Sequence, residues 1–204
     1  MPVALYTFGQ FILPSEHPDN RGFHDRNDAN LAAVDRAEGL IGRSGYEGDP
    51  GPESWGTQVF PRFWQDPFGD GWAPSTLSWW RDLESIWAYT YSGIHAEALA
   101  KGRTWFRKGD WPPLVMWWSE MRPDWVEGVA RHEQLHDHGA SAHAFGFRQA
   151  FGAAGRHAAP DRARVREIAA RNATNDLASR AGHPTFEDDA RDWAGGGKAG
   201  LSRP

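Results

Sequence analysis

Tryptophan is the residue that most constrains this chain. Eleven of its twelve tryptophans lie in one central segment, between Trp55 and Trp125. A core of this size does not need so many large rings for packing, because each ring buries a large apolar area. A surplus of flat, apolar side chains in one segment is typical of a pocket wall. We therefore expect a central pocket that binds a flat, hydrophobic small molecule.

Composition places the chain among folded, globular proteins and excludes several kinds of chemistry. Apolar residues make up 40% and charged residues 24% of the 204 positions, which is enough to build a core. The absence of cysteine excludes disulfides, cysteine-ligated zinc, iron–sulfur clusters, thiolate-ligated haem and a cysteine nucleophile. A net charge of −5 argues against nucleic acid or an anionic membrane as partner. With no signal-like or membrane-spanning stretch, we expect a cytoplasmic protein.

Hydrophobic patterns and turn residues divide the chain into alternating strands and helices. Strands are expected at 3–13, 57–60, 75–80, 114–118 and 142–147, and helices at 27–42, 83–91, 95–106, 123–138 and 160–181. Residues 47–74 hold ten glycines or prolines, so this segment is expected to be mainly an irregular loop. Residues 1–151 form the predicted domain. Residues 152–204 are rich in alanine, arginine and glycine and are expected to be a partly helical extension with a mobile tail.

The order of these elements indicates an α+β fold of the ferredoxin-like βαββαβ kind. Both helices of such a unit lie on one face of a four-stranded sheet. The other face is then bare and must be buried against something. A second copy of the same sheet is the simplest cover, so we expect a homodimer.

One segment matches a metal-binding motif. His132, Glu133 and His136 form H-E-x-x-H, in which two imidazoles one helical turn apart chelate zinc and the glutamate polarises a bound water. His138 and His143 are candidates for the third ligand. Polar residues flank the motif, as they do on an ordinary surface helix. A zinc hydrolase is therefore an alternative interpretation, and a chance match to the motif is the simpler interpretation.

A second candidate centre surrounds His95, which follows the Ser92-Gly93 helix break. A neutral imidazole there suits an axial haem ligand or a general base, while a histidine that only caps the helix is the simplest alternative. Tyr91 lies close by in sequence. Arg103, two turns along the same helix, is a candidate partner for a propionate or another carboxylate.

Several segments together resemble the bacterial domain-of-unknown-function family 3291. They are TLSWWRDLES at 76–85, YTYSGIHAEAL at 89–99, RTWF at 103–106, WW at 117–118, PDW at 123–125, LHDHG at 135–139 and AFGF at 144–147. The resemblance covers about residues 3–151. It implies membership of the dimeric α/β-barrel superfamily, with spheroidene monooxygenase as a distant neighbour. Some members of that superfamily bind haem, and others are monooxygenases that need no cofactor.

The resemblance extends to a pair of residues. In haem-degrading members a tryptophan and an axial histidine lie on the same second helix, and Trp87 and His95 resemble that pair at a different spacing. We therefore expect a haem-dependent oxidoreductase or monooxygenase-like enzyme acting on a hydrophobic small molecule of specialised metabolism. His95 is the expected iron ligand. The residues expected around it are Trp80, Trp87, Tyr91, Arg103 and Trp105.

Three other functions stay open from the sequence. The first is a cofactor-free monooxygenase, isomerase or cyclase with His95 as general base. The second is the zinc hydrolase through His132, Glu133 and His136. The third is a dimer that binds a small molecule without turning it over.

Overall fold

The computed structural model describes residues 1–180, and the predicted mobile tail lies outside the described residues. Four strands and five α-helices follow one another with one short 3₁₀ turn. They are β1 (Val3–Phe8), η1 (Pro18–Asn20), α1 (Arg21–Asp35), β2 (Leu40–Arg43), β3 (Ser75–Trp80), α2 (Leu83–Thr90), α3 (Gly93–Trp105), β4 (Leu114–Trp118), α4 (Trp125–His138) and α5 (Arg162–Arg180). The prediction of a mixed α+β protein is confirmed.

The strands form one open sheet in the order β2-β3-β1-β4, with every neighbouring pair antiparallel. β1 is central, and Val3 pairs with Trp80 on one side and with Trp118 on the other. Side chains alternate between the two faces of a strand. Val3 and Leu5 therefore face one layer of the protein, while Ala4 and Tyr6 face another.

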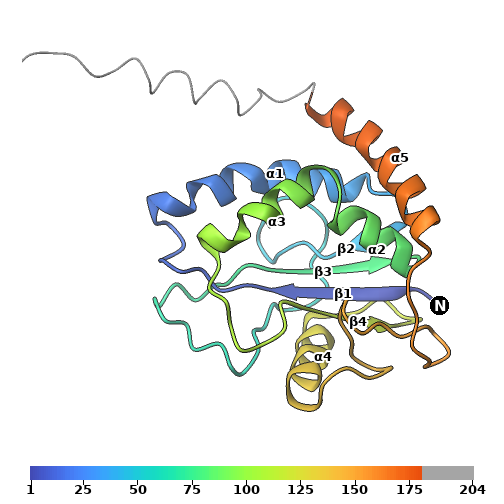
Figure 1. The fold of residues 1–204 in the computed structure, drawn as a ribbon. Coiled ribbons are helices and arrows are strands. Elements are labelled where there is room, and N and C mark those ends of the chain that lie inside the picture. Colours follow the sequence, from blue (N-terminus) through green and yellow to red (C-terminus); the bar gives the residue numbers. More distant parts are fainter. Residues whose placement is uncertain (181–204) are drawn as a thin grey trace, which may run out of the picture.

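Helices cover both faces of the sheet. α1, α2 and α3 lie on one side, and α4 lies on the other (Figure 1). On the first side, Val34 of α1 and Ile86 of α2 pack in one buried cluster with Leu5 and Trp80 of the sheet. This cluster forms the core beneath the amino-terminal helices.

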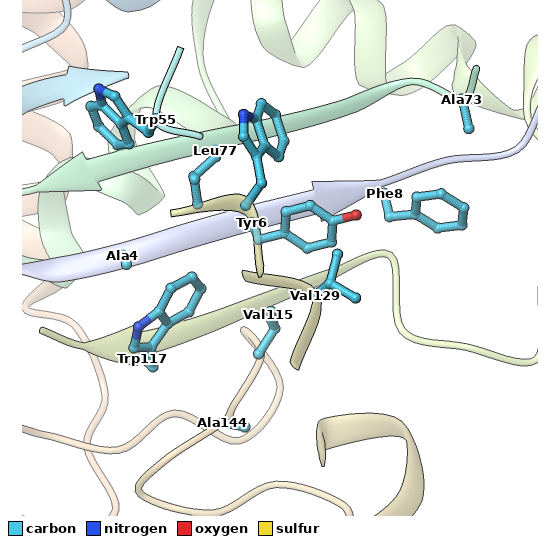
Figure 2. Close-up of a cluster of buried hydrophobic side chains, with 11 residues drawn as sticks. Ala4, Tyr6, Phe8, Trp55, Ala73, Leu77, Val115, Trp117, Val129 and Ala144 are labelled. Atoms are coloured by element: carbon cyan, nitrogen blue, oxygen red, sulfur yellow. The ribbon is translucent and has the colours of Figure 1, made fainter. Parts of the chain in front are cut away.

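The prediction that one sheet face is bare is wrong for the single chain. Tyr6 of β1, Trp117 of β4, and Trp125 and Val129 of α4 belong to one buried cluster on that face, part of which is drawn in Figure 2. Trp55, from the long loop before β3, completes the cover. The sheet therefore has no apolar face left over to require a second copy.

Two predicted strands are also wrong. Residues 57–60 are irregular, and the second strand is β2, which follows a turn at Gly39. Residues 142–147 form no strand, but Phe145 exchanges two backbone hydrogen bonds with Met116, at 2.7 and 2.9 Å. This isolated bridge covers the outer edge of β4.

Two predicted boundaries shift at the amino-terminal end. β1 ends at Phe8 rather than at residue 13, because the chain then leaves the sheet and Ile12 N donates to Trp105 O. α1 begins at Arg21 rather than at residue 27, directly after the 3₁₀ turn η1. His17 caps that turn by accepting from Asp19 N, and Pro18 opens it.

The predicted helices around the Ser92-Gly93 break and before Gly139 are confirmed. Asp82 starts α2 as an N-cap, with Oδ1 accepting from the backbone N of Ser85 at 2.9 Å and from its hydroxyl at 2.7 Å. The other carboxylate oxygen of Asp82 pairs with Arg164 of α5 at 2.5 Å. One aspartate thus starts α2 and anchors the carboxyl-terminal helix.

We expect Asp82→Ala to lower the free energy of unfolding by about 2 kcal/mol. This is the upper end of the range for a lost N-cap, and we expect it because the substitution also removes the ion pair to Arg164. Asp124→Ala is the matched control. Asp124 caps α4 through Glu127 N at 2.7 Å and lies on the exposed surface. Its loss should cost about 1 kcal/mol. Equal losses in urea denaturation would show that the anchor to α5 contributes nothing.

Candidate active-site cleft

A large cleft is lined by residues of α1 and α3 and by the sheet, and it continues around the strand ends at Phe8 and Ser75. It encloses about 1650 Å³, more than a drug-sized ligand needs. α1 and α3 pack on each other above the sheet (Figure 1). The space beneath them is therefore bounded by helix on one side and by strands on the other.

Polar side chains line the floor of the cleft. The hydroxyls of Thr7 on β1 and Thr76 on β3 lie 2.7 Å apart. The neighbouring Ser78 hydroxyl accepts a hydrogen bond from Trp80 Nε1 at 2.8 Å. The buried Asn30 Oδ1, on the α1 side, has no hydrogen-bond partner among the described residues. A ligand of this cleft thus meets polar groups among apolar walls.

His95 lies at the edge of this cleft because of the helix break before it. α2 ends at Thr90, and the last carbonyls of a helix have no partner within it. His95 Nδ1 lies 3.0 Å from the Thr90 carbonyl and donates to it, which leaves Nε2 as the ring's acceptor. Burial lowers the pKa of His95, although the Thr90 carbonyl opposes this effect. The imidazole is therefore held neutral at ordinary pH.

Aromatic rings extend from His95 to the floor of the cleft. Tyr89 lies 4.8 Å from His95 and 5.5 Å from the fully buried Trp80, between ring centroids. Tyr91 lines the cleft from the end of α2 but is 53% exposed. Trp105 lines it from the end of α3. His95, Trp80, Tyr91 and Trp105 thus all line this cleft.

Two predicted site residues lie elsewhere. Trp87 packs edge-on against Phe147 at 4.4 Å and does not line the cleft. Arg103 lies on the exposed side of α3, away from the cleft. The cations that do line it include Arg26, whose guanidinium lies 5.9 Å from the Trp105 ring, and Arg43, which forms an ion pair with Asp35 at 2.7 Å.

The H-E-x-x-H segment is structural in the described chain. His132 is fully buried, and its Nε2 donates to the Pro112 carbonyl at 2.5 Å. Glu133 accepts from the backbone N of Arg62 at 2.6 Å. Within residues 1–180, no three histidine or carboxylate side chains are grouped so as to hold a metal ion. The zinc alternative therefore lacks a ligand set there, because His132 belongs to the core.

Together, the fold and the cleft define a mixed α+β protein with an open antiparallel sheet and a ligand-sized cavity under two helices. A family model described as "Domain of unknown function (DUF3291)" matches residues 2–162. The chain belongs to this family, as the sequence motifs indicated. No curated protein and no solved structure matches the chain. Within residues 1–180, every helix is too short or too polar to cross a membrane.

Proposed function

We propose that the cleft is the active site of an enzyme that removes a proton from a hydrophobic small molecule, with His95 as general base. The position of His95 carries this proposal. Its Nδ1 proton is fixed on the Thr90 carbonyl, its Nε2 is left with a lone pair, and burial keeps the ring neutral. A base poised in this way suits abstraction of a weakly acidic C–H or O–H proton.

The cleft walls suit the substrate class. Trp80 and Trp105 offer flat apolar surfaces, and the hydroxyls of Thr7 and Thr76 offer hydrogen bonds on the floor. An apolar molecule with a few oxygens matches such a lining. Cofactor-free monooxygenation, isomerisation and cyclisation can all begin with removal of such a proton.

Haem is the second candidate, favoured by the cleft volume and by the position of His95 at the edge of the cleft. A histidine that ligates a metal usually gives its other N–H to a carbonyl, as His95 does. The fit is incomplete, because Trp87 and Arg103, both expected around a haem, lie outside the cleft. We therefore derive no step through haem.

The proposed kinship with the dimeric α/β-barrel superfamily rests on the resemblance and on the antiparallel strand order β2-β3-β1-β4. The homodimer is part of the same proposal. α4 and Trp55 cover the sheet face that would otherwise pair with a second sheet. A dimer of this chain would accordingly use another surface.

We expect the purified chain, free of haem, to catalyse deuterium uptake from D₂O into flat 1,3-dicarbonyl or phenolic compounds. His95→Gln should lower the rate about 10²- to 10⁴-fold, the usual contribution of a general base. His24→Gln is the matched control, since His24 also lines the cleft but contacts the Ser15 carbonyl on the exposed surface. NMR of the substrate protons measures the exchange.

Two results would contradict the proposal. One is exchange by His95→Gln at the wild-type rate. The other is a saturable Soret band on haemin titration, at one haem per chain and lost in His95→Ala, which would assign His95 to iron.

A further inference from the structure

A small void, partly open to solvent, lies beside His95. It holds about 10 Å³ and is lined by Ala33, Arg36, Ala37, Tyr89, Ser92, His95 and Asn172. By this measure of volume, such a void is close to the size of one water molecule. His95 and Tyr89 line both this void and the large cleft. Whatever occupies the void therefore lies against the proposed base.

Asn172 of α5 presents an unpartnered donor there. The residue is 6% exposed, and its Oδ1 accepts from the backbone N of Glu38 at 2.9 Å. This bond fixes which end of the amide is the donor. Nδ2 is buried and has no hydrogen-bond partner in the described chain. Because a buried, unsatisfied donor costs about 1–3 kcal/mol, an occupant that accepts its hydrogen bond is strongly favoured.

Ion pairs between α5 and the rest of the chain hold Asn172 beside this void. Arg171 forms an ion pair with Glu38, the residue whose backbone N donates to Asn172. Near the start of α5, Arg164 pairs with Asp82. The family match ends at residue 162, so Asn172 lies beyond the matched region. This chain thus adds a polar group from outside the family domain to the surroundings of His95.

We propose that one water molecule occupies the void and bridges Asn172 to His95, which makes Asn172 a positioning residue for that imidazole. The water accepts from Asn172 Nδ2 and donates to His95 Nε2, since His95 Nδ1 is engaged by Thr90. His95 then acts as base through this water, which passes one of its own protons to Nε2 as it takes the proton of the substrate. Arg36, directly after α1, and Tyr89 of α2 are the other charged or titratable groups around the void. This inference rests on the proposed function in one respect, namely that His95 is the general base.

The test is an NMR titration of His95 in the full, ligand-free chain with ¹⁵N-labelled histidine. Asn172→Asp keeps the side-chain shape and an acceptor for Glu38 N, but it replaces the donor with a negative charge. We expect it to raise the midpoint of the His95 titration by about one pH unit, because a carboxylate one water away favours the imidazolium. Ala173→Asp is the matched control, since it adds the same charge at the next, exposed position. It should move the midpoint much less.

The water itself gives a second measurement. The Asn172 side-chain amide should show a cross-relaxation signal to a long-lived water in the wild type, and Asn172→Leu should lose that water. A midpoint shift no larger in Asn172→Asp than in Ala173→Asp, or no bound water in the wild type, would overturn the inference. Neither measurement requires a substrate. If His95→Gln retains proton exchange while the water bridge is observed, the proposed function fails and the bridge stands.

Discussion

Gly39→Ala is expected to lower the free energy of unfolding by about 3 kcal/mol, because it adds a steric clash to backbone strain. Gly39 has φ +85°, a left-handed conformation that a side chain strains. A methyl group there would lie 2.1 Å from the Ser85 hydroxyl and 2.6 Å from its Cβ. Ser85 is fully buried, and Asp82 holds both its backbone N and its hydroxyl. It therefore cannot move aside.

Gly48→Ala separates the two causes of this loss. Gly48 has nearly the same backbone angle, φ +87°, but a methyl group there meets nothing within 4 Å. Its substitution should cost only the backbone strain, about 1 kcal/mol. Urea denaturation of both variants measures the difference. Equal losses would mean that α2 shifts to accommodate the methyl group, and that the contact between Gly39 and Ser85 is not tight.

The elements with strong local signals were predictable from the sequence. β3 and β4 are short apolar runs between breakers, and the structure has them at 75–80 and 114–118, as predicted. The N-cap residue Asp82 marks the start of α2. Gly139 marks the end of α4, and its φ of +75° suits glycine. In each case the residues that fix the boundary lie within a few positions of it in the sequence, so a local sequence pattern is enough to predict it.

β2 was missed because its stabilisation is not local. The strand has only four residues, its side chains are half-buried or exposed, and it pairs with β3 through an irregular register between Leu40 and Gly42. Ile41, which lies within the helix predicted at 27–42, is 48% exposed on β2. The start of α1 was missed for a different reason. Its lead-in turn is capped by His17, which is not among the usual N-cap residues.

The covered sheet face was visible in the sequence but was misread. Trp125, Val129 and His132 recur at a spacing of three to four residues, and this stripe is the buried side of α4. Gly128, on the same side, lets the helix approach the Tyr6 ring, since a methyl group there would lie 3.2 Å from it. The zinc motif drew attention to His132 as a ligand. Its spacing from Trp125 and Val129 indicated a core position instead.

Helical spacing accounts for which of the predicted residues on α3 line the cleft. His95 and Trp105 line the cleft together with Leu99 and Gly102, at spacings that return to one side of α3. Arg103 is eight residues beyond His95, rotated away from that side, and is exposed. Asn172 carried no sequence signal, because α5 reaches His95 through contacts more than 75 residues apart.

Stability should fall as the pH is lowered from about 6.5, and His132 should be a principal cause. The ring is fully buried among Tyr6, Phe8 and Phe63, at centroid distances of 5.4, 6.0 and 5.3 Å. Its Nδ1 is buried with no hydrogen-bond partner in the described chain, so a second proton on the ring would be a buried, unpaired charge. Burial accordingly lowers the pKa of His132, although its bond to the Pro112 carbonyl opposes the effect.

The direction of the pH dependence follows from proton linkage. The folded-state pKa of His132 lies below that of the unfolded chain, about 6.5, so the unfolded state binds the proton first as the pH falls. The stabilisation is complete above about pH 6.5 and is lost progressively below it, down to the lowered pKa. His95 acts in the same direction, because its pKa is also lowered by burial. His132→Gln should therefore remove part of the acid sensitivity and leave the part due to His95.

The measurement is the free energy of unfolding in urea between about pH 7.5 and 5, above the range in which most carboxylates titrate. His132→Gln will lose some packing at every pH, so the readout is the slope of stability against pH and not its level. Val129→Ala, which loses packing in the same buried cluster under α4 but removes no titratable group, is the matched control and should keep the wild-type slope. If His132→Gln also keeps that slope, the buried imidazole accepts its second proton without penalty. The α4 core would then have to open to water in acid before the chain unfolds.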